Sequence, residues 1–553
     1  MAWAHRWLYE DGLINVRIVE NLVNGDGPVF NLGERVEAYT SPAQIAAVAA
    51  GRAATFGVVR IEDITFVIGV GAATTGLVLA MLGAKHLWGG DDGRSWSLPI
   101  GAVAFAAVPA AWDYATSGHE GGLSYLWIGA SLWILARRAR ELRAGLEPRV
   151  DAPLRLLVVL GSGAMVRPEY LLYSISLGIA WFWLHRGLAG SRLRAVAAMA
   201  SVTVAYEIFR MGYFGLLLSN TAVAKLGADL PLGWHYVNSF LEPYALAIPL
   251  LIVTVTLLWV SVQRGRIERA VVLAFVIPAV LQVAYLIQIG GDYVNGRLLL
   301  PPLLAFVAPV AVVPSRLLFR SAPGRGWTSA ATNPWTYFVG AIGVWAVACA
   351  LVLRPPVDID RTNFLDPRFD TRAVSIHRWL HDTPSRRISE YETSFLTGPY
   401  KDIVRARAQG HPAVLSARGA FFSQQVTLDP SSHPALITRG IGAVSVLTWP
   451  NVHIYDTLGL ADPIAAHVPP EGTSPGHTRA LPSPWFSARA GVTEDPQSAA
   501  AAEAMACGSL ATLLDASQEP MSPGRFLSNL VHAPANTFLV VPREPEDAVD
   551  EFC

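Results

Sequence analysis

Charged side chains are scarce in this sequence. Asp, Glu, Lys and Arg together make up 15% of the 553 residues, and hydrophobic residues make up 52%. A typical soluble domain is roughly 25% charged. The formal net charge of -1 leaves no basic surplus of the kind that nucleic-acid binding needs. The composition therefore predicts a multi-pass membrane protein whose partner is the lipid bilayer and not a nucleic acid.

Several motifs of familiar enzymes are missing as well. The chain has no glycine-rich phosphate loop, no G-x-G-x-x-G after a strand, no H-E-x-x-H and no cysteine cluster. These absences argue against a nucleotide-sugar donor and against zinc chemistry. The N-terminus lacks the basic and apolar regions of a signal peptide, and no internal repeat is visible.

Cysteine is rare, with three residues in the whole chain. Cys349 lies in an apolar run, where we expect it to be inert packing. Cys507 and Cys553 lie in the polar C-terminal third. If that third faces an oxidising space, we expect the two to form a disulfide.

Long apolar runs dominate the first two thirds of the chain. A spanning helix needs about 20 predominantly apolar residues, and somewhat fewer where its flanks snorkel. We predict ten spans, at 64–85, 98–113, 121–136, 152–166, 170–185, 195–210, 244–262, 270–289, 297–314 and 335–353. The shorter, alanine-rich run at 43–58 is predicted to be an interfacial or re-entrant helix.

The distribution of basic residues sets the predicted orientation. Lysine and arginine are concentrated in the loops near 85–94, 137–143, 186–194, 264–269 and 316–325. The positive-inside rule places these loops in the cytoplasm and residues 1–60 and the chain after 354 outside. An external N-terminus without a signal sequence suggests that one more helix precedes this chain.

Three regions follow from this topology: a first external loop with interfacial helices (1–60), a transmembrane domain (61–354) and an external soluble domain (355–553). The last region is rich in proline and polar residues. Strand-like pieces such as "AVSVLTWPNVHIY" and "NTFLVVP" predict a compact α/β or mainly β fold there.

The few charges on the external side fall at the outer ends of predicted spans. Ionisable groups at such depth are costly unless they are paired or hydrated, so a group of them is a functional-site hypothesis. The set comprises Glu10, Asp11, Arg35, Glu37, Asp113, Glu120, Arg167, Glu169, Arg210, Asn220, Lys225, Asp292 and Arg297. For any single pair, such as Arg167 with Glu169, a structural ion pair between helix ends is an equal alternative.

These residue types suit glycosyl transfer from a lipid phosphate. Carboxylates can act as a base or stabilise a cation-like sugar, and Arg and Lys can hold the phosphate leaving group. A lipid-linked sugar transporter and a scaffold for cell-wall assembly are the alternatives. A transporter is expected to carry inverted repeats and polar residues at mid-membrane, which the sequence does not show.

The motifs that carry these charges recur in the order of a known family. "EDGLINVR", "NGDGPVFNLGERVEAYTS", "ATSGHEGG", "VRPEY", "FRMGYFGLL" with "NTAVAK", and "GGDYVNGRLLLPPL" resemble the C-type membrane glycosyltransferases. Among these the resemblance is greatest to the actinobacterial terminal beta-(1→2) arabinofuranosyltransferases. It extends into the C-terminal third through "YDTLGLADPIAAH" and "RFLSNLVH".

The resemblance implies a polytopic helical fold with eleven membrane helices, ten of them in this chain, and catalysis on the periplasmic face of the cell membrane. It implies decaprenylphosphoryl arabinose as donor and arabinan of arabinogalactan or lipoarabinomannan as acceptor. Another polyprenyl-phosphate sugar transferase of the same fold stays open. The resemblance implies no cofactor and does not fix the oligomeric state. A divalent cation bound by Asp11 and Glu10 is an alternative, since hard cations prefer carboxylate oxygens.

Site roles follow from the same resemblance. The family commonly reads Asp-Asp-Gly where this chain has Glu10, Asp11 and Gly12, so Asp11 inherits the catalytic role and Glu10 is the departure. His119, Val294 and Asn295 also depart from the family pattern. The expected phosphate holders are Arg210, Lys225 and Arg297, and the expected sugar-orienting residues are Arg35, Glu37, Glu120, Arg167, Glu169, Asn220 and Asp292.

Overall fold

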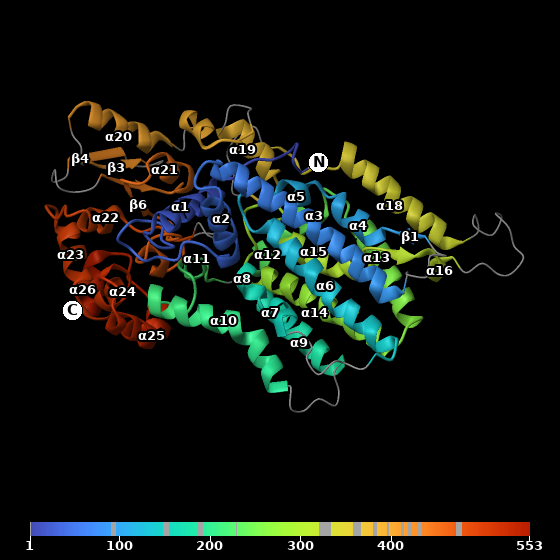
Figure 1. Cartoon of the computed structure of the whole chain (residues 1–553). Coiled ribbons are helices and arrows are strands. Elements are labelled where there is room, and N and C mark those ends of the chain that lie inside the picture. Colours follow the sequence, from blue (N-terminus) through green and yellow to red (C-terminus); the bar gives the residue numbers. More distant parts are fainter. Residues whose placement is uncertain are drawn as a thin grey trace, which may run out of the picture. The chain divides into compact units, whose positions relative to one another are not determined.

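The computed structural model describes residues 2–553 except 90–95, 147–153, 185–191, 228, 320–332, 358–365, 380–383, 395–396, 411–413, 419–422, 428–433 and 472–477. Parts of three of the predicted cytoplasmic loops fall in these gaps. The chain forms two compact units (Figure 1). The first contains Met1–Arg6, Phe66–Thr203 and Asp229–Thr371, and the second contains Trp7–Thr65, Val204–Ala228 and Arg372–Cys553. The second unit thus draws its segments from both sides of the predicted boundary at 354.

Apolar helices build the first unit. Its long helices are α3 (Ile61–Trp88, in this unit from Phe66), α6 (Gly121–Arg143), α9 (Leu171–Leu184), α10 (Arg192–Phe214, in this unit as far as Thr203), α12 (Leu230–Leu241), α13 (Ala247–Val262), α14 (Arg266–Gln288) and α18 (Pro334–Leu351). Among the described residues, α3, α14 and α18 are long and apolar enough to cross a membrane. These helices confirm the prediction of an α-helical membrane protein.

Several predicted spans are interrupted where proline occurs. The run 98–113 contains α4 (Ile100–Ala106) and α5 (Pro109–Asp113), and 297–314 contains η3 (Arg297–Leu299), α15 (Leu300–Val307) and η4 (Ala308–Val310). The two runs are joined by strands β1 (Ser97–Leu98) and β2 (Val313–Pro314). Proline lacks the amide hydrogen that continues a helix, and hydropathy does not detect this. The run 152–166 divides at Ser162, between two glycines and without a proline, into α7 (Leu154–Gly161) and α8 (Gly163–Val166), followed by η1 (Pro168–Tyr170).

Glycines allow α3 and α6 to cross in close contact. A Cβ on Gly129 of α6 would lie 1.9 Å from the carbonyl oxygen of Gly76 in α3, and one on Gly76 would lie 2.3 Å from the backbone of Tyr125. Helices in membranes associate through such small residues because lipid supplies no hydrophobic drive between them. This contact places the start of α6, with Glu120 just before it, against α3.

The second unit is an α/β structure with more helix than strand. Its sheet has the order β4-β3-β5-β6, with β3 (Val414–Arg418) antiparallel to β4 (Ser423–Thr427) and parallel to β5 (Ala435–Thr438), which is parallel to β6 (His453–Asp456). The helices are α1 (Glu10–Asn24), α2 (Pro42–Ala54), α11 (Asn220–Ala224), α19 (Thr371–Trp379, in this unit from Arg372), η5 (Ile388–Thr393), α20 (Gly398–Ala408), α21 (Gly442–Leu447), η7 (Ala465–His467), α22 (Ser483–Arg489), α23 (Pro496–Met505), α24 (Gly508–Gln518), α25 (Pro523–Thr537) and α26 (Pro545–Phe552).

One of the two predicted strand pieces is confirmed in part and the other is wrong. The end of "AVSVLTWPNVHIY" forms β6, but its start, "AVSVL", lies in helix α21. "NTFLVVP" begins inside α25 and continues outside the sheet. Tertiary contacts override the β propensity of valine at both places. The start of α21 packs on α1, and the amide of Val541 donates to the carbonyl oxygen of His467, 3.0 Å away, rather than to a strand.

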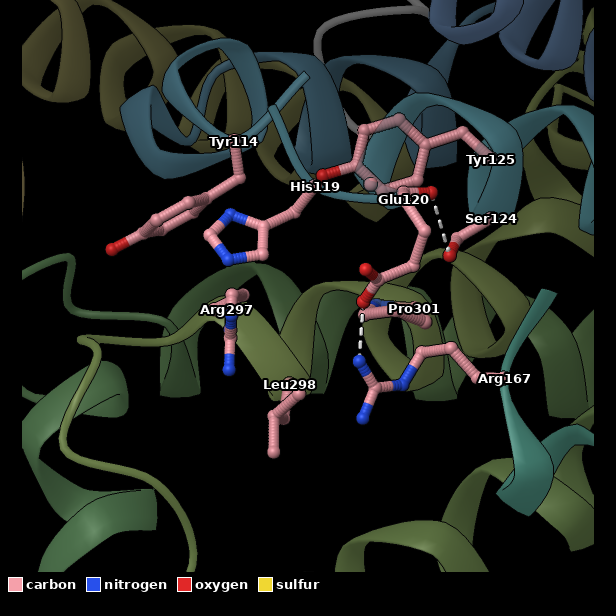
Figure 2. A pocket seen from close by; sticks show the side chains of 10 residues that line it. Tyr114, His119, Glu120, Ser124, Tyr125, Arg167, Arg297, Leu298 and Pro301 are labelled. Atoms are coloured by element: carbon pink, nitrogen blue, oxygen red, sulfur yellow. Dashed lines mark hydrogen bonds and ion pairs between the residues drawn. The ribbon is translucent and has the colours of Figure 1, made fainter. Parts of the chain in front are cut away.

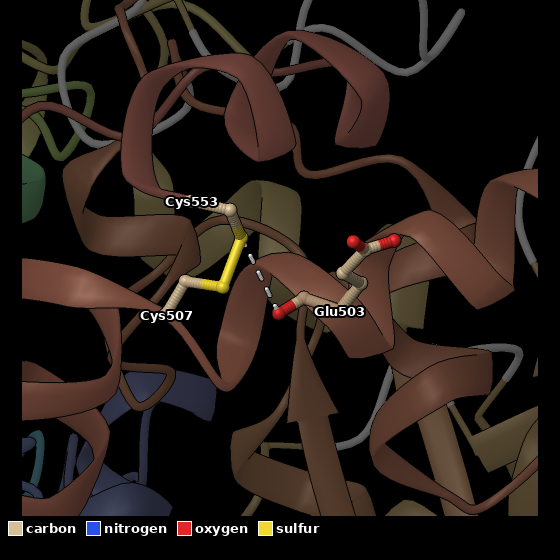
Figure 3. Close-up of a disulfide and its surroundings, with 3 residues drawn as sticks. All are labelled: Glu503, Cys507 and Cys553. Atoms are coloured by element: carbon tan, nitrogen blue, oxygen red, sulfur yellow. Dashed lines mark hydrogen bonds between the residues drawn. A yellow bond between two sulfur atoms is a disulfide. The ribbon is translucent and has the colours of Figure 1, made fainter.

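A disulfide joins Cys507, before α24, to Cys553 at the end of α26 (Figure 3). The sulfur of Cys553 also lies 3.8 Å from the carbonyl oxygen of Glu503. The aromatic core beside it includes Trp485, which is fully buried and donates from Nε1 to the carbonyl oxygen of Arg543 at 2.8 Å. Trp485 is therefore part of the core of this unit.

Candidate functional site

The predicted site residues divide between the two units. Glu120, Arg167, Glu169, Asp292 and Arg297 belong to the first unit, and Glu10, Asp11, Arg35, Glu37, Arg210, Asn220 and Lys225 belong to the second.

Arg167 joins two carboxylates in the first unit. Its backbone is extended and separates α8 from η1, so that its side chain projects toward the start of α6. The guanidinium donates from Nη1 to Glu120 and from Nε to Glu169. Glu120 is buried directly before the first residue of α6. The ion pairs of Arg167 thus connect the start of α6 to the segment between α8 and η1, and they fix the position of the guanidinium.

Asp292 and Arg297 pair within the turn that follows α14. Arg297 Nε and Nη2 lie 3.1 and 2.6 Å from Asp292 Oδ2. The turn depends on glycine, because Gly291 and Gly296 both have positive φ. A Cβ on Gly291 would lie 2.4 Å from the ring of Tyr236, and one on Gly296 would lie 2.2 Å from the ring of Phe240. The sequence "GGDYVNGR" therefore specifies a tight turn that presents one arginine and one carboxylate.

These residues meet around a small cavity. It encloses about 290 Å³ not filled by atoms, open solvent included, and is lined by Tyr114, His119, Glu120, Gly121, Ser124, Tyr125, Arg167, Arg297, Leu298 and Pro301. Figure 2 shows the side chains of Arg167 and Arg297 across the cavity from Tyr114, His119 and Tyr125. Two guanidinium groups, three hydroxyl groups and one imidazole therefore line a space with room for about one water-sized group.

The Glu120 carboxylate in this cavity stays ionised across the physiological pH range. Burial alone raises the pKa of Glu120, but the positive charges of Arg167, His119 and Arg297 outweigh it and lower the pKa to about 2. Glu120 is therefore an anion that orients cations, rather than a group that exchanges protons. A phosphate that enters this cavity must share each arginine with a carboxylate that already binds it.

Glu10 and Asp11 begin helix α1 in the second unit. Glu10 has 6% of its surface exposed, and its Oε1 accepts hydrogen bonds from the amides of Gly442 at 2.6 Å and Ala443 at 3.1 Å. Asp11 is half-buried. Burial, and next the charge of Asp11, raise the pKa of Glu10 above its ordinary range, although the two amides lower it. Burial beside a second carboxylate therefore favours the protonated form of Glu10.

Glu37 and Arg210 form a buried ion pair. Arg210 Nε lies 2.6 Å from Glu37 Oε2 and Nη2 lies 3.3 Å from Oε1, while Nη1 binds Glu207 at 2.7 Å. Glu37 is fully buried and also accepts from the hydroxyl of Tyr206 at 2.6 Å. Arg210, which we predicted to hold phosphate, is thus bound by two carboxylates and ties the first loop to α10.

Arg35 and Asn220 support the backbone. Arg35 donates to the carbonyl oxygens of Tyr213 at 3.1 Å and Ala516 at 2.9 Å. Asn220 Nδ2 donates to the carbonyl oxygens of Gly459 at 2.7 Å and Asp462 at 3.1 Å, which ties α11 to the segment before η7. Lys225, which follows the last residue of α11, is half-buried.

Sequence reasoning missed several buried polar groups. Arg489 binds both Glu34 and Asp462 inside the second unit. Tyr114, Ser124 and Tyr125 line the cavity of the first unit but carry no charge that would have marked them. Their position beside "TSGHE" in the sequence was the available signal. Across the described residues, no three His, Cys, Asp or Glu side chains are grouped as metal ligands would be.

Comparison with known proteins relates the whole chain to one group. The model of the AftB family C-terminal domain matches residues 422–551. The terminal beta-(1→2)-arabinofuranosyltransferase of Mycobacterium tuberculosis is 30% identical, with 98% of this chain and 94% of that protein covered. The protein with the same description in Corynebacterium glutamicum is 28% identical, with 100% of this chain and 85% of that protein covered. No solved structure matches the chain.

Proposed function

The chain belongs to the family of terminal beta-(1→2)-arabinofuranosyltransferases, and from this membership we propose that it transfers arabinofuranose to the non-reducing ends of cell-wall arabinan. The observation that carries the proposal is similarity over 98% of the chain, so that both units are included. The matched relatives are described as transferases, which favours an enzyme over the transporter and the scaffold.

The donor in this proposal is decaprenylphosphoryl arabinose. Helices that can cross a membrane support a donor whose tail stays in the bilayer. The proposed topology is the C-type glycosyltransferase fold with ten spans here, one preceding helix, and a periplasmic site and C-terminal domain. The disulfide of Cys507 and Cys553 supports an oxidising environment for that domain.

Asp11 is the proposed catalytic carboxylate. The fold uses the Glu10 carboxyl to bind α21, and burial favours its neutral form. Asp11 is left as the ionised partner, suited to attack the anomeric carbon or to stabilise positive charge there as the bond to phosphate breaks. Glu10 then positions Asp11 and does not itself react.

The polar residues that line the cavity of the first unit are the proposed contacts for the donor's phosphate and sugar hydroxyls, with Arg297 as the main phosphate contact. The Glu120 carboxylate there stays ionised, which suits a role in orienting Arg167 more than one in proton transfer. In the second unit Lys225 is the proposed phosphate contact, and Arg210 acts through Glu37 as a positioning residue. The reaction is proposed to need no metal ion, so activity should survive EDTA.

The test is transfer by the purified chain in lipid nanodiscs to a short synthetic arabinan. Polyprenylphosphoryl arabinofuranose should serve as donor, with product linkage read by nuclear magnetic resonance as terminal beta-(1→2). Polyprenylphosphoryl mannose and a nucleotide-linked arabinose serve as matched alternatives. Transfer from either alternative at an equal rate would overturn the donor assignment.

A further inference from the structure

Helix α25 turns three of its polar side chains toward the protein. Asn529 Nδ2 donates to the carbonyl oxygens of Gly212 at 3.1 Å and Ala516 at 3.0 Å, and Asn536 Nδ2 donates to that of Gly215 at 3.1 Å. Thr537 Oγ1 accepts from the amide of Leu217 at 2.7 Å. All three side chains are buried. The inner face of α25 is thus polar and fastened to the end of α10 and the turn after it.

The outer face carries exposed apolar side chains, and the exposed His532 follows one of them in the helix. Leu527 is 63% exposed, Val531 is 72% exposed, and Phe538, just after the helix, is 65% exposed. Leu527 and Val531 are four residues apart and so lie on the same face of the helix. A helix between protein and water has the opposite arrangement, with its apolar stripe inward. Apolar side chains outward and polar ones inward suit a hydrocarbon surrounding, where polar groups must find partners inside the protein.

The elements next to α25 also support a lipid environment for its outer face. In Figure 1 it lies beside α10, and the hydrogen bonds of Asn529 and Asn536 place it against residues 212–215. The part of α10 in this unit also exposes apolar side chains, Val204 and Ile208. The outer surface of α25 therefore continues an apolar helix surface in a chain that crosses membranes.

We propose that α25 and the segment that follows it lie in the membrane–water interface, with Leu527, Val531 and Phe538 inserted among lipid acyl chains. The occupant of this surface is the bilayer, and not a second copy or another protein. The C-terminal unit is thereby held at the membrane, where a lipid-linked donor and a polymer acceptor meet. The proposal rests on the geometry of α25 and stands whether or not arabinose is the transferred sugar.

The test attaches an environment-sensitive fluorophore to Val531→Cys in the full chain, in a Cys349→Ala background and without reductant, so that the native disulfide stays closed. The chain is placed as single copies in nanodiscs made with or without brominated lipid. The matched control is Glu494→Cys, an exposed polar position of the same unit outside this surface. Bromine should quench the label at 531 several-fold and leave the label at 494 unchanged.

A second variant tests the apolar contact itself. Leu527→Gln together with Phe538→Gln should reduce the quenching at 531 toward the control level, and because both side chains are exposed the thermal unfolding temperature should not change. A blue-shifted label at 531 that bromine does not quench would show that protein covers the surface. A water-like spectrum would show that nothing covers it, and either result overturns the proposal. Since no readout uses turnover, failure of the transfer assay leaves this test intact.

Discussion

Glu10 and Asp11 are adjacent in the chain, yet the fold treats their carboxyl groups differently. Glu10 Oε1 lies 2.6 Å from the amide nitrogen of Gly442 and is buried, whereas Asp11 is half-buried. The backbone there is close-packed, since a Cβ on Gly442 would lie 1.9 Å from the carbonyl oxygen of Glu10. One carboxyl thus fixes the position of the other, and the central claim about chemistry rests on Asp11.

The helix crossing in the first unit predicts opposite effects for two glycines of α3. Gly76→Ala should destabilise the protein by about 1–3 kcal/mol, because its Cβ meets the backbone of Tyr125. Gly71→Ala is the control, because its Cβ meets nothing and alanine favours the helix. Thermal unfolding in nanodiscs measures both. Equal unfolding temperatures for the two variants would refute the close crossing.

Arg489 should be essential for the stability of the second unit. Arg489→Met leaves the buried carboxylates of Glu34 and Asp462 without their cation, at a cost of about 3–5 kcal/mol. Arg405→Met removes a guanidinium that is 66% exposed from its ion pair with Asp402 and should change stability by less than about 1 kcal/mol. Limited proteolysis across a denaturant series compares them. If the two variants resist protease equally, the Arg489 network is not a stabilising contact.

The second unit should lose stability in mild acid through His467. Burial lowers the pKa of His467 from 6.5 to about 4, and Nδ1 donates to the carbonyl oxygen of Pro463 at 2.6 Å. Since the unfolded state binds the proton more readily, stability is full above pH 6.5 and falls as pH drops toward 4, by about 3 kcal/mol at most.

The pH dependence of unfolding checks this sign. His467→Gln should flatten the decline between those two pH values, and the exposed His532→Gln should leave it unchanged. A wild-type protein that gains stability on acidification through this range would contradict the assignment.

Glu120 should affect the rate of transfer, but its own titration should not appear in the pH dependence of that rate. Arg167, His119 and Arg297 lower its pKa to about 2, so it stays ionised across the physiological pH range. Glu120→Gln weakens its charge-assisted bond to Arg167 and should lower kcat/KM by about 10- to 100-fold. Glu141→Gln, at the far end of α6, is the control. A titration that disappears in Glu120→Gln would show that Glu120 exchanges protons.

Hydropathy located the uninterrupted helices well. The predicted spans 270–289 and 335–353 correspond to α14 (Arg266–Gln288) and α18 (Pro334–Leu351). It failed where proline divides an apolar run, as between β1 and α5, because transfer energy does not register a missing amide hydrogen. The helix α21 was missed for a different reason, since its packing on α1 involves residues more than 400 positions away.

The charged residues were found from sequence, but their partners were not. Glu37 lies 173 positions from Arg210 in the sequence. The residues next to Arg210 in the chain therefore do not show that its guanidinium is bound by a carboxylate rather than available to a phosphate. Asn220 stood beside charged motifs yet supports a backbone segment. Charge content marks where buried ionisable groups occur, and only the fold shows which of them the protein itself has already bound.

The most direct test compares Asp11→Asn with Glu10→Gln in the arabinosyl transfer assay, using samples matched for unfolding temperature. Glutamine resembles the neutral form of Glu10 and keeps an acceptor for the amides of Gly442 and Ala443. We predict that Glu10→Gln retains turnover within about tenfold, whereas Asp11→Asn loses at least about a thousandfold with donor binding intact. Equal losses in the two variants, or turnover retained by Asp11→Asn, would contradict the account.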